Sequence, residues 1–366
     1  MGRWGSERLP VRLASRQLFL LIMLSTRCYG APDIDGKFRH RRYASKYFSS
    51  PRRPELNHPL ARRSSEQLCV RFLRDVEFET KNAQRKTQHW GSELSTNIPS
   101  FQFENVLLND WELLRCLETL RDVGLMLIKK VPEKTGQVRK LAERIARLRY
   151  TSYGEEFTVK SKFEPSNLAY TGHKLGLHTD LPHYHYTPSI QFLHCIKQCI
   201  GDGGDSNFSD GFNAALQLKE QDPEFFEILS TTYIEYVDVG HDQFEYYTRH
   251  PQTVFTFDQF GDLFMVLYNN SVRTITMPMP KDKVYGYYRA MKAYDNILNS
   301  PANIVRHKMQ PGDLVVFNNV RVLHGREAFN VHGSGERHLE GGYIDWDDVH
   351  SRIRVLRTKF DLPVNG

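Results

Sequence analysis

The sequence predicts an α+β fold, with a mostly antiparallel β core and helices on its flank. From residue 167 onward, short β-rich runs alternate with turns, a texture typical of antiparallel sheets. Amphipathic segments with apolar residues at helical spacing precede these runs and interrupt them,. The chain has 366 residues, of which 40% are apolar and 25% charged. It is therefore long enough for one large catalytic domain and an appendage.

The first 87 residues are predicted to be a targeting and extension segment. Residues 1–30 begin with spaced arginines and continue with the apolar run "LFLLIML" and the small-residue exit "STRCYGA", an order that fits a secretory signal. Arginine is abundant and acid scarce up to residue 50, which fits a mitochondrial presequence as well. Residues 31–87 have high charge and few apolar repeats, so we expect a poorly ordered linker. The folded domain is predicted to span residues 88–366.

The first elements of this domain are a helix, a buried strand and a second helix. Residues 109–124 have apolar residues at helical spacing, an Asn-Asp cap at the start and Gly124 at the end,. The run "LMLIKKV" directly after Gly124 predicts a short buried strand. Residues 135–150, "TGQVRKLAERIARLRY", are expected to form a second amphipathic helix,.

The rest of the domain is predicted to be a β core with two inserted helical stretches. The strands are expected in residues 189–197, 254–257, 262–270 and 313–319, with a turn-rich stretch at 201–211,. The helical stretches are "AALQLKEQDPEFFEILS" at 214–230 and "VYGYYRAMKAYDNILNS" at 284–300. No internal repeat is present in the sequence.

Composition argues against several classes of partner. Much of the excess positive charge lies before residue 90 in a chain of net charge +6, so a nucleic-acid partner is not expected. No apolar run reaches the roughly 18–20 residues of a membrane span. The five cysteines are an odd, sparse set, which suggests free thiols in a reducing compartment. Cys195 and Cys199 lack a second pair with zinc-like spacing.

The stretch "LGLHTDLPHYHY" at 175–186 contains candidate metal ligands. In an extended segment, side chains two residues apart share a face, so His178 and Asp180 could hold one ion. His324 follows a Pro-Gly-Asp turn and an apolar strand and would supply the third ligand. Two imidazoles and one carboxylate are the set expected for non-haem Fe(II) oxygenases, although ligand type alone leaves zinc open. His183 and His185 are expected to line or flank the pocket.

Arg337 lies thirteen residues after His324, in "GERHLEGGYIDW". A dicarboxylate co-substrate that chelates iron through its 2-oxo acid end needs a fixed cation for its far carboxylate. A guanidinium meets this need bidentately. An isolated arginine is more often part of a surface ion pair, but its order after the distal histidine favours a co-substrate role for Arg337.

Several motifs carry a family resemblance. "NLAYTGHKLGLHTDLP", "IQFLHCIKQ", "GGDSNFSDGF", "YNN", "VLHGRE" and "RHLEGGYIDWDD" occur in this order. The chain resembles the γ-butyrobetaine and trimethyllysine dioxygenases, which use Fe(II) and 2-oxoglutarate, and resembles the butyrobetaine members more closely. The resemblance implies a double-stranded β-helix (jelly-roll) core, carnitine biosynthesis as the setting, O2 as co-substrate and ascorbate as a stimulant. It assigns iron to His178, Asp180 and His324, and 2-oxoglutarate to Arg337 and Leu193.

The resemblance also assigns substrate contacts. A trimethylammonium group has no N–H to donate, so aromatic faces must recognise it. The matching aromatic positions are Tyr153, Phe157, Tyr170 and Tyr343. Asn167 and Asn269 match the positions that bind the substrate carboxylate, and an amide can donate N–H without adding charge.

The chain departs from the family pattern at three places. Phe157 stands where a tryptophan is usual, which weakens the cation–π contact. Leu181 stands where a tyrosine is usual, which removes a hydroxyl beside the iron site. Members usually carry a small zinc domain in front, but only Cys28 and Cys69 are present there. We therefore expect this domain to be missing or replaced. Because the zinc domain contributes to dimer contacts in the family, the resemblance leaves both a homodimer and other oligomeric states open.

The compartment and two further functions stay open at this point. The sequons at Asn207 and Asn269 argue against secretion, because a glycan on Asn269 would block the substrate pocket. Mitochondria and the cytoplasm remain, and the arginine-rich start favours mitochondria, with the cytoplasm as the alternative. A protein that binds quaternary ammonium ligands without turnover would have no need for Arg337 and the metal ligands together. A zinc hydrolase would have no role for Arg337 or the aromatic positions.

Overall fold

A computed structural model describes residues 87–160, 171–330 and 337–363. All of them lie in one compact unit of the chain, Ala83–Gly366. The predicted targeting and extension segment lies outside the described residues, apart from Thr87. Two predicted substrate contacts, Asn167 and Tyr170, also lie outside them.

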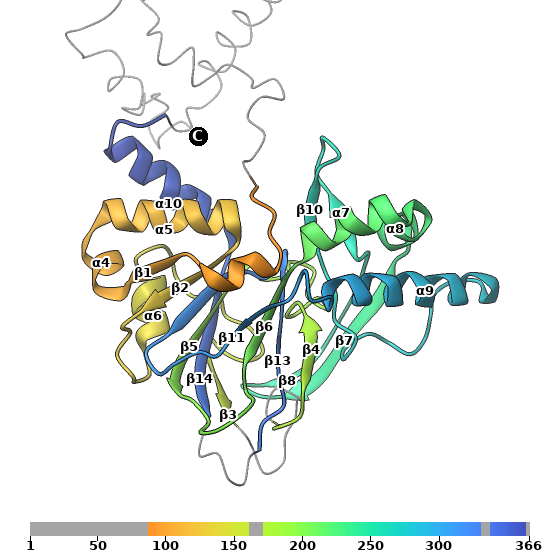
Figure 1. Cartoon of the computed structure of the whole chain (residues 1–366), viewed down its shortest axis with the longest axis horizontal. Coiled ribbons are helices and arrows are strands. Elements are labelled where there is room, and N and C mark those ends of the chain that lie inside the picture. Colours follow the sequence, from red (N-terminus) through yellow and green to blue (C-terminus); the bar gives the residue numbers. More distant parts are fainter. Residues whose placement is uncertain (1–86, 161–170, 331–336, 364–366) are drawn as a thin grey trace, which may run out of the picture. The chain divides into compact units, whose positions relative to one another are not determined.

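Two sheets form the core of this unit (Figure 1). The six-stranded sheet has the order β1-β2-β12-β5-β14-β3, and the four-stranded sheet has the order β11-β6-β13-β4. All pairings in both sheets are antiparallel except β1 with β2. The predicted antiparallel, jelly-roll type of core is confirmed. The strands are β1 (Ser100–Gln102), β2 (Leu125–Lys129), β3 (Glu156–Lys160), β4 (Leu175–His178), β5 (Ile190–Lys197), β6 (Ser206–Asp210), β11 (Val305–His307), β12 (Leu314–Asn318), β13 (Val322–Arg326) and β14 (His338–Ile344).

Side-chain alternation along the strands builds two layers of core. On β2, Leu125 and Leu127 join the apolar cluster between the two sheets, which also contains Phe208 of the four-stranded sheet. Met126 and Ile128 point to the opposite face and join the cluster under the helices. Because successive side chains of a strand face opposite sides, a continuous apolar run such as "LMLIK" is what a strand buried on both faces requires.

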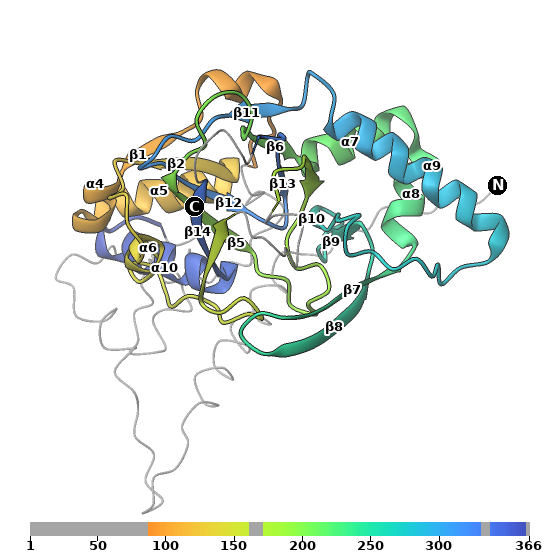
Figure 2. The same ribbon diagram turned by 90° about the horizontal axis from the view of Figure 1, so that it is seen from below.

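The helices form two groups at opposite ends of the unit (Figures 1 and 2). One group packs on the outer face of the six-stranded sheet through the apolar cluster of its helices. The other packs with hairpin β9–β10 (Phe255–Phe257 and Leu263–Val266) beside the four-stranded sheet. The first group is α4 (Phe103–Leu108), α5 (Asp110–Val123), α6 (Gln137–Ala142) and α10 (Trp346–Lys359); the second is α7 (Gly211–Gln221), α8 (Pro223–Thr231) and α9 (Lys281–Leu298); a short 3-10 turn, η1 (Ser92–Thr96), precedes β1.

Helix α5 begins and ends where the sequence predicts. The Asn109 side chain accepts hydrogen bonds from the backbone N–H groups of Trp111 and Glu112, at 2.8 and 3.3 Å, which is a standard amino-terminal cap. The helix ends at Gly124, whose φ of +81° is left-handed and therefore suits glycine.

Two helix predictions are wrong in extent. The helix expected over 135–150 is limited to α6, which has no side-chain cap at Gly136. Further on, the backbone N–H of Arg149 donates to the Tyr343 carbonyl of β14 at 2.8 Å, so a tertiary contact holds this end of the chain outside a helix. The single helix expected over 214–230 is two helices, because Pro223 has no N–H to continue the first one.

Two antiparallel hairpins complete the unit. Hairpin β9–β10 (Phe255–Phe257 and Leu263–Val266) falls within the predicted strands. Hairpin β7–β8 (Ile234–His241 and Glu245–Gln252) was not predicted and forms the long curved pair in Figure 2. Its second strand alternates between exposed and half-buried residues, so it has no clear apolar face.

In the described ranges, no helix is long and apolar enough to cross a bilayer.

Candidate functional site

Strand pairing brings two of the predicted metal ligands together. His324 of β13 lies directly opposite His178 of β4. A side chain at Gly325 would place its Cβ 2.7 Å from the Leu175 carbonyl oxygen, so only glycine lets β4 approach this closely. His324 was expected at the end of the apolar strand, but it lies in the middle of the next strand, β13. Gly325, directly after His324, therefore allows His324 and His178 to lie close together.

Asp180 is held by a side-chain clamp and not by strand pairing. Strand β4 ends at His178, so the expectation that one strand supplies both ligands is only partly right. The Asp180 N–H donates to Asn319 Oδ1 at 2.8 Å, and Asn319 Nδ2 donates back to the Asp180 carbonyl at 3.0 Å. The chain then turns at Leu181, whose φ of +57° is left-handed. Asn319, which the sequence analysis missed, thus fixes the backbone of a candidate ligand.

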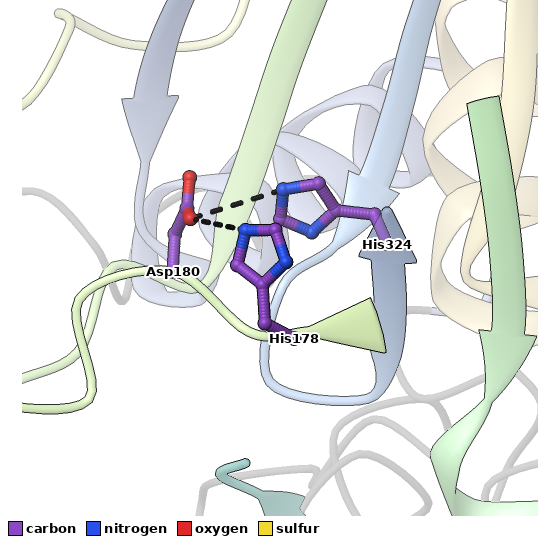
Figure 3. A group of neighbouring side chains, drawn as sticks. All are labelled: His178, Asp180 and His324. Atoms are coloured by element: carbon purple, nitrogen blue, oxygen red, sulfur yellow. Dashed lines mark ion pairs between the residues drawn. The ribbon is translucent and has the colours of Figure 1, made fainter. Parts of the chain in front are cut away.

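The three candidate ligands converge on one point (Figure 3). Asp180 Oδ1 lies 3.2 Å from His178 Nε2 and 3.8 Å from His324 Nε2. One ligand atom from each residue lies within 4.8 Å of the others. His178 Nδ1 lies 2.8 Å from the Gly176 carbonyl oxygen, which can only accept, so Nδ1 carries a proton. The Nε2 lone pair of His178 is thereby directed to the centre of the group.

The charges of this group suit a divalent metal. Burial lowers the pKa of His324 to about 3, and the neighbouring His178 acts in the same direction, so its imidazole is neutral. Burial would raise the pKa of Asp180, but the two histidines and the Tyr343 hydroxyl hold it well below its usual range,. Burial would lower the pKa of His178, but Asp180 and the Gly176 carbonyl raise it, so a bound metal would take the place of the Nε2 proton. One ionised carboxylate and two imidazoles are the ligand set of non-haem Fe(II) sites.

The second oxygen of Asp180 is held by two donors on neighbouring strands. Tyr343 donates its hydroxyl to Asp180 Oδ2 at 2.7 Å, and Gln191 Nε2 donates to the same oxygen at 2.7 Å. Tyr343 and Gln191 lie opposite each other on β14 and β5. Tyr343 was predicted only as an aromatic substrate contact, and Gln191 was missed, although a lone glutamine in the apolar run "SIQFLHCIK" is an available signal. These bonds orient the carboxylate toward the histidines.

The predicted site residues within the described ranges line one cavity of about 120 Å³. They come from β3, β4, β5, β13, β14 and the connecting loops. His183 also lines this cavity, whereas His185 is exposed and contacts His250. The predicted residues on the lining are Tyr153, Phe157, His178, Asp180, Leu193, Asn269, His324, Arg337 and Tyr343.

Arg337 is a buried cation facing the cavity. Arg337 is only 5% exposed, and its Nε has no hydrogen-bond partner among the described residues. Among the described residues, no carboxylate forms an ion pair with it. Arg326 lies on the same lining but is already bonded to the carbonyls of Thr171 and His173, at 2.6 and 2.7 Å. Burial, followed by the charge of Arg337, lowers the pKa of Arg326 to about 10. This positive region is suited to an anionic ligand.

Three of the predicted aromatic contacts form a continuous wall, which we call the aromatic wall: Tyr153, Phe157 and Tyr343. The rings of Phe157 and Tyr343 stack with centroids 5.2 Å apart, and Tyr153 lies 6.0 Å from Phe157. Phe157 lies over Gly341, where an added Cβ would come within 2.3 Å of its Cζ. The glycine of "EGGY" thus makes room for a ring of the wall.

Asn269 and Leu193 occupy other parts of the lining. Asn269 Nδ2 donates to the Thr179 carbonyl at 3.2 Å, and its Oδ1 accepts from the Ser271 N–H at 2.9 Å. An amide nitrogen has two N–H groups, so the second one is available to a ligand. Leu193 lies on β5 opposite Gly341 of β14 and contributes an apolar surface.

Comparison with known proteins agrees with this geometry. The family model described as "Taurine catabolism dioxygenase TauD, TfdA family" matches residues 81–343. The γ-butyrobetaine dioxygenase of Homo sapiens is 39% identical over 274 residues, covering 75% of this chain and 70% of that protein. The mitochondrial trimethyllysine dioxygenase of Mus musculus is 33% identical over 274 residues, covering 73% and 63%.

A solved structure supports the fold. The crystal structure of AAD-2 in complex with Mn(II) and N-oxalylglycine matches with a TM-score of 0.50 at 16% identity, covering 63% of this chain and 88% of that chain. At this identity the likeness concerns the fold alone. Together with the family match and the His-Asp-His group, it agrees with a jelly-roll oxygenase. The chain therefore belongs to the TauD, TfdA family and is an Fe(II)- and 2-oxoglutarate-dependent dioxygenase.

Proposed function

We propose that this enzyme hydroxylates γ-butyrobetaine to L-carnitine. One observation carries the proposal: a single cavity joins the His-Asp-His group, a buried arginine without an ion pair among the described residues, and an aromatic wall. A zinc hydrolase would leave the last two without a role. The relatives that share 39% identity over 75% of the chain are named γ-butyrobetaine dioxygenases, which supports this substrate.

The metal and co-substrate roles follow from the donors. His178, Asp180 and His324 would hold Fe(II), because their donor atoms converge, the Asp180 carboxylate is ionised and the His324 imidazole is neutral,. Arg337 would bind the far carboxylate of 2-oxoglutarate, with Leu193 against its carbon chain. When bound, iron with 2-oxoglutarate and O2 supplies the oxidation, in which one oxygen atom enters the substrate and the other enters succinate as CO2 leaves.

The aromatic wall would bind the trimethylammonium group. Tyr153 and Phe157 line the cavity with their rings 6.0 Å apart, and aromatic rings attract a cation that lacks N–H groups. The amide of Asn269 would donate to the substrate carboxylate. Asn167 and Tyr170, outside the described residues, complete this assignment by their match to the family motif. Holding both ends of the substrate fixes which carbon faces the metal.

Substrate turnover tests the proposal directly. The full-length protein is loaded with Fe(II) and 2-oxoglutarate without O2, and the weak visible charge-transfer band is recorded. O2 and ascorbate are then added with γ-butyrobetaine and with trimethyllysine in parallel, and succinate and hydroxylated products are quantified by mass spectrometry. Carnitine and succinate in equal amounts are the expected result. Succinate without carnitine would refute the γ-butyrobetaine assignment.

Trimethyllysine hydroxylation is the second candidate function. Relatives with this name are 33% identical over 73% of the chain, and Leu181 replaces a tyrosine that the butyrobetaine resemblance leads us to expect. Leu181 lines the cavity, so it can affect the choice between the two substrates.

The placement of the enzyme is part of the same proposal. We assign residues 1–87 to mitochondrial targeting and extension and residues 88–366 to the catalytic domain, with the cytoplasm as the alternative compartment. Both sequon residues, Asn207 and Asn269, are buried at 3% and 8% exposure, which disfavours glycosylation in a folded secreted protein. Imaging of a carboxy-terminal fluorescent fusion tests the compartment. Light scattering on the purified protein tests for the homodimer suggested by the family.

A further inference from the structure

A carboxylate lies behind the aromatic wall without a cationic side chain to pair with it. Asp238 of β7 accepts hydrogen bonds on Oδ2 from the hydroxyls of Tyr153 and Tyr246, each at 3.4 Å. Its side chain is only 19% exposed. In the part of the chain that the structure describes, no lysine or arginine lies within ion-pairing distance of Asp238. Because Tyr153 lines the cavity and donates its hydroxyl to Asp238, the negative charge of Asp238 lies one side chain away from the cavity.

A buried histidine beside Asp238 does not neutralise this charge. His183 is 2% exposed, lines the cavity, and has no hydrogen-bond partner on either ring nitrogen. Its Nε2 lies 3.8 Å from Asp238 Oδ2. Burial lowers the pKa of His183 to about 4, so the ring is neutral at neutral pH. The contact is therefore not an ion pair, although its distance would allow one.

The surroundings of Asp238 favour a positive ligand. Burial raises the pKa of Asp238; the hydroxyls of Tyr153 and Tyr246 oppose this effect, and the charge of Asp242 adds to it. A carboxylate removed from water without a counter-ion is costly. A cation bound against the wall would relieve this cost. A phenol that donates to a carboxylate also gains electron density on its ring, which strengthens its attraction for a cation.

We propose that Asp238 is a positioning and charge-selecting residue for the quaternary ammonium ligand. It fixes the hydroxyl of Tyr153 and supplies negative charge behind the aromatic wall. The pocket then prefers a trimethylammonium group over a neutral group of the same shape. This inference rests on the proposed function and extends it, because the ring faces alone need not account for the charge preference.

The test compares a cation with its neutral carbon isostere. γ-Butyrobetaine and 5,5-dimethylhexanoate differ only in the central atom of the bulky group, nitrogen or carbon. Their Kd values are measured by anaerobic calorimetry on the full-length protein loaded with Fe(II) and 2-oxoglutarate. In Asp238→Asn, we expect the Kd of γ-butyrobetaine to rise on the order of tenfold and that of the isostere to change less than about twofold. The preference for the cation, which is the Kd of the isostere divided by the Kd of γ-butyrobetaine, should therefore fall.

Asp242→Asn is the matched control. It removes the same charge from the same hairpin, and Asp242 bonds to Tyr246 at 3.4 Å but has no described bond to Tyr153. We expect the cation preference of this variant to stay within about twofold of wild type. In a Tyr153→Phe background, Asp238→Asn should have a smaller effect, because the two residues act partly as a unit.

The possible outcomes separate this inference from the proposed function. If Asp238→Asn keeps the wild-type preference for the cation, or weakens both ligands equally, the inference is overturned while γ-butyrobetaine turnover by wild type still stands. If wild type neither binds nor hydroxylates γ-butyrobetaine, both fail. Should Asp238→Asn not fold, Tyr153→Phe keeps the ring and removes its bond to Asp238. It is expected to lower the preference about threefold, and an unchanged preference would overturn the inference.

Discussion

Tyr343 combines two interactions that a single substitution can separate. Its hydroxyl donates to Asp180 Oδ2 at 2.7 Å, while its ring stacks on Phe157 with centroids 5.2 Å apart. Tyr343→Phe removes the first interaction and keeps the second. The variant therefore asks whether Tyr343 acts mainly as a substrate contact or as a donor that orients a metal ligand.

The expected effect can be worked from the hydrogen bonds of Asp180. A hydrogen bond to a charged group contributes about 1.5–3 kcal/mol, which corresponds to about a 10- to 100-fold change in affinity. Gln191 still donates to the same oxygen at 2.7 Å, so we expect the lower end of this range. The Kd for Fe(II) should rise about tenfold in Tyr343→Phe, in line with the usual effect of removing partners of metal ligands.

The assay is an anaerobic titration of Fe(II) in excess 2-oxoglutarate, followed by the visible charge-transfer band. The KM for γ-butyrobetaine is measured separately at saturating Fe(II) and should change less than about twofold. Phe157→Leu is the matched control: it alters the wall without touching Asp180 and should show the reverse pattern. An unchanged Kd for Fe(II) in Tyr343→Phe, together with a several-fold rise in KM, would refute the orienting role.

Three further substitutions test the anion site, the wall and the core. Arg337→Met should raise the KM for 2-oxoglutarate at least about thirtyfold, because truncating a buried charged partner costs about 2–5 kcal/mol. Arg337→Lys should raise this KM by less, and neither variant should change the Kd for Fe(II) much. Succinate release measures the KM. Gly341→Ala places a Cβ 2.3 Å from the Phe157 ring, so overpacking should destabilise the fold by about 1–3 kcal/mol, measured by urea unfolding. At Gly286 in α9 an added Cβ would lie 3.9 Å from Ile228 Cδ1, an ordinary contact, so Gly286→Ala should be neutral or stabilising by up to about 1 kcal/mol. Asp210→Asn leaves the guanidinium of Arg321, bonded to Asp210 at 2.7 Å, buried without its partner and should cost about 3–5 kcal/mol.

The Asp210 prediction includes a pH dependence of known sign. Burial would raise the pKa of Asp210, but Arg321 and His89 lower it to about 2. A carboxyl with a pKa below its unfolded value of about 3.9 stabilises the fold above that value and loses this contribution as pH falls toward 2. The stability gap between wild type and Asp210→Asn should therefore narrow below about pH 4. A gap that is equal at pH 7 and pH 3 would contradict this account.

The Arg337 and Gly341 predictions can be refuted in a similar way. A KM for 2-oxoglutarate in Arg337→Met within about threefold of wild type would remove Arg337 from the co-substrate site. Equal unfolding midpoints for the Gly341→Ala and Gly286→Ala variants would show that Phe157 can move without cost. In both cases the matched variant separates a local effect from a general loss of folding.

Local signals predicted the elements they encode. Helix α5 begins at Asn109 and ends at Gly124 as expected, because a capping amide and a left-handed glycine each act within a few residues,. The stretch 214–230 contained a comparable signal at Pro223, and reading it as a break would have given the two observed helices. Hairpin β7–β8 lacks such a signal, since its second strand has no buried face.

Contacts between distant residues could not be predicted from composition or spacing. The sequence indicated His178, Asp180 and His324 by residue type, and family resemblance made the set specific. Two of the three partners that orient Asp180, Asn319 and Tyr343, are 139 and 163 residues away. Nothing near either residue in the sequence indicates these bonds. They depend on the strand register of the folded sheet.

The arrangement around Asp180 separates metal binding from substrate choice. Its backbone groups bond to Asn319, and its Oδ2 bonds to Tyr343 and Gln191, so Oδ1 is the oxygen left to face the histidines. The bonds that give this orientation are made by protein groups alone,. Leu181, where the chain departs from the family pattern, lies on the cavity lining and outside this set of bonds. Substitutions in the wall should therefore change substrate choice without changing metal affinity, and Tyr343 is the described residue that belongs to both sets.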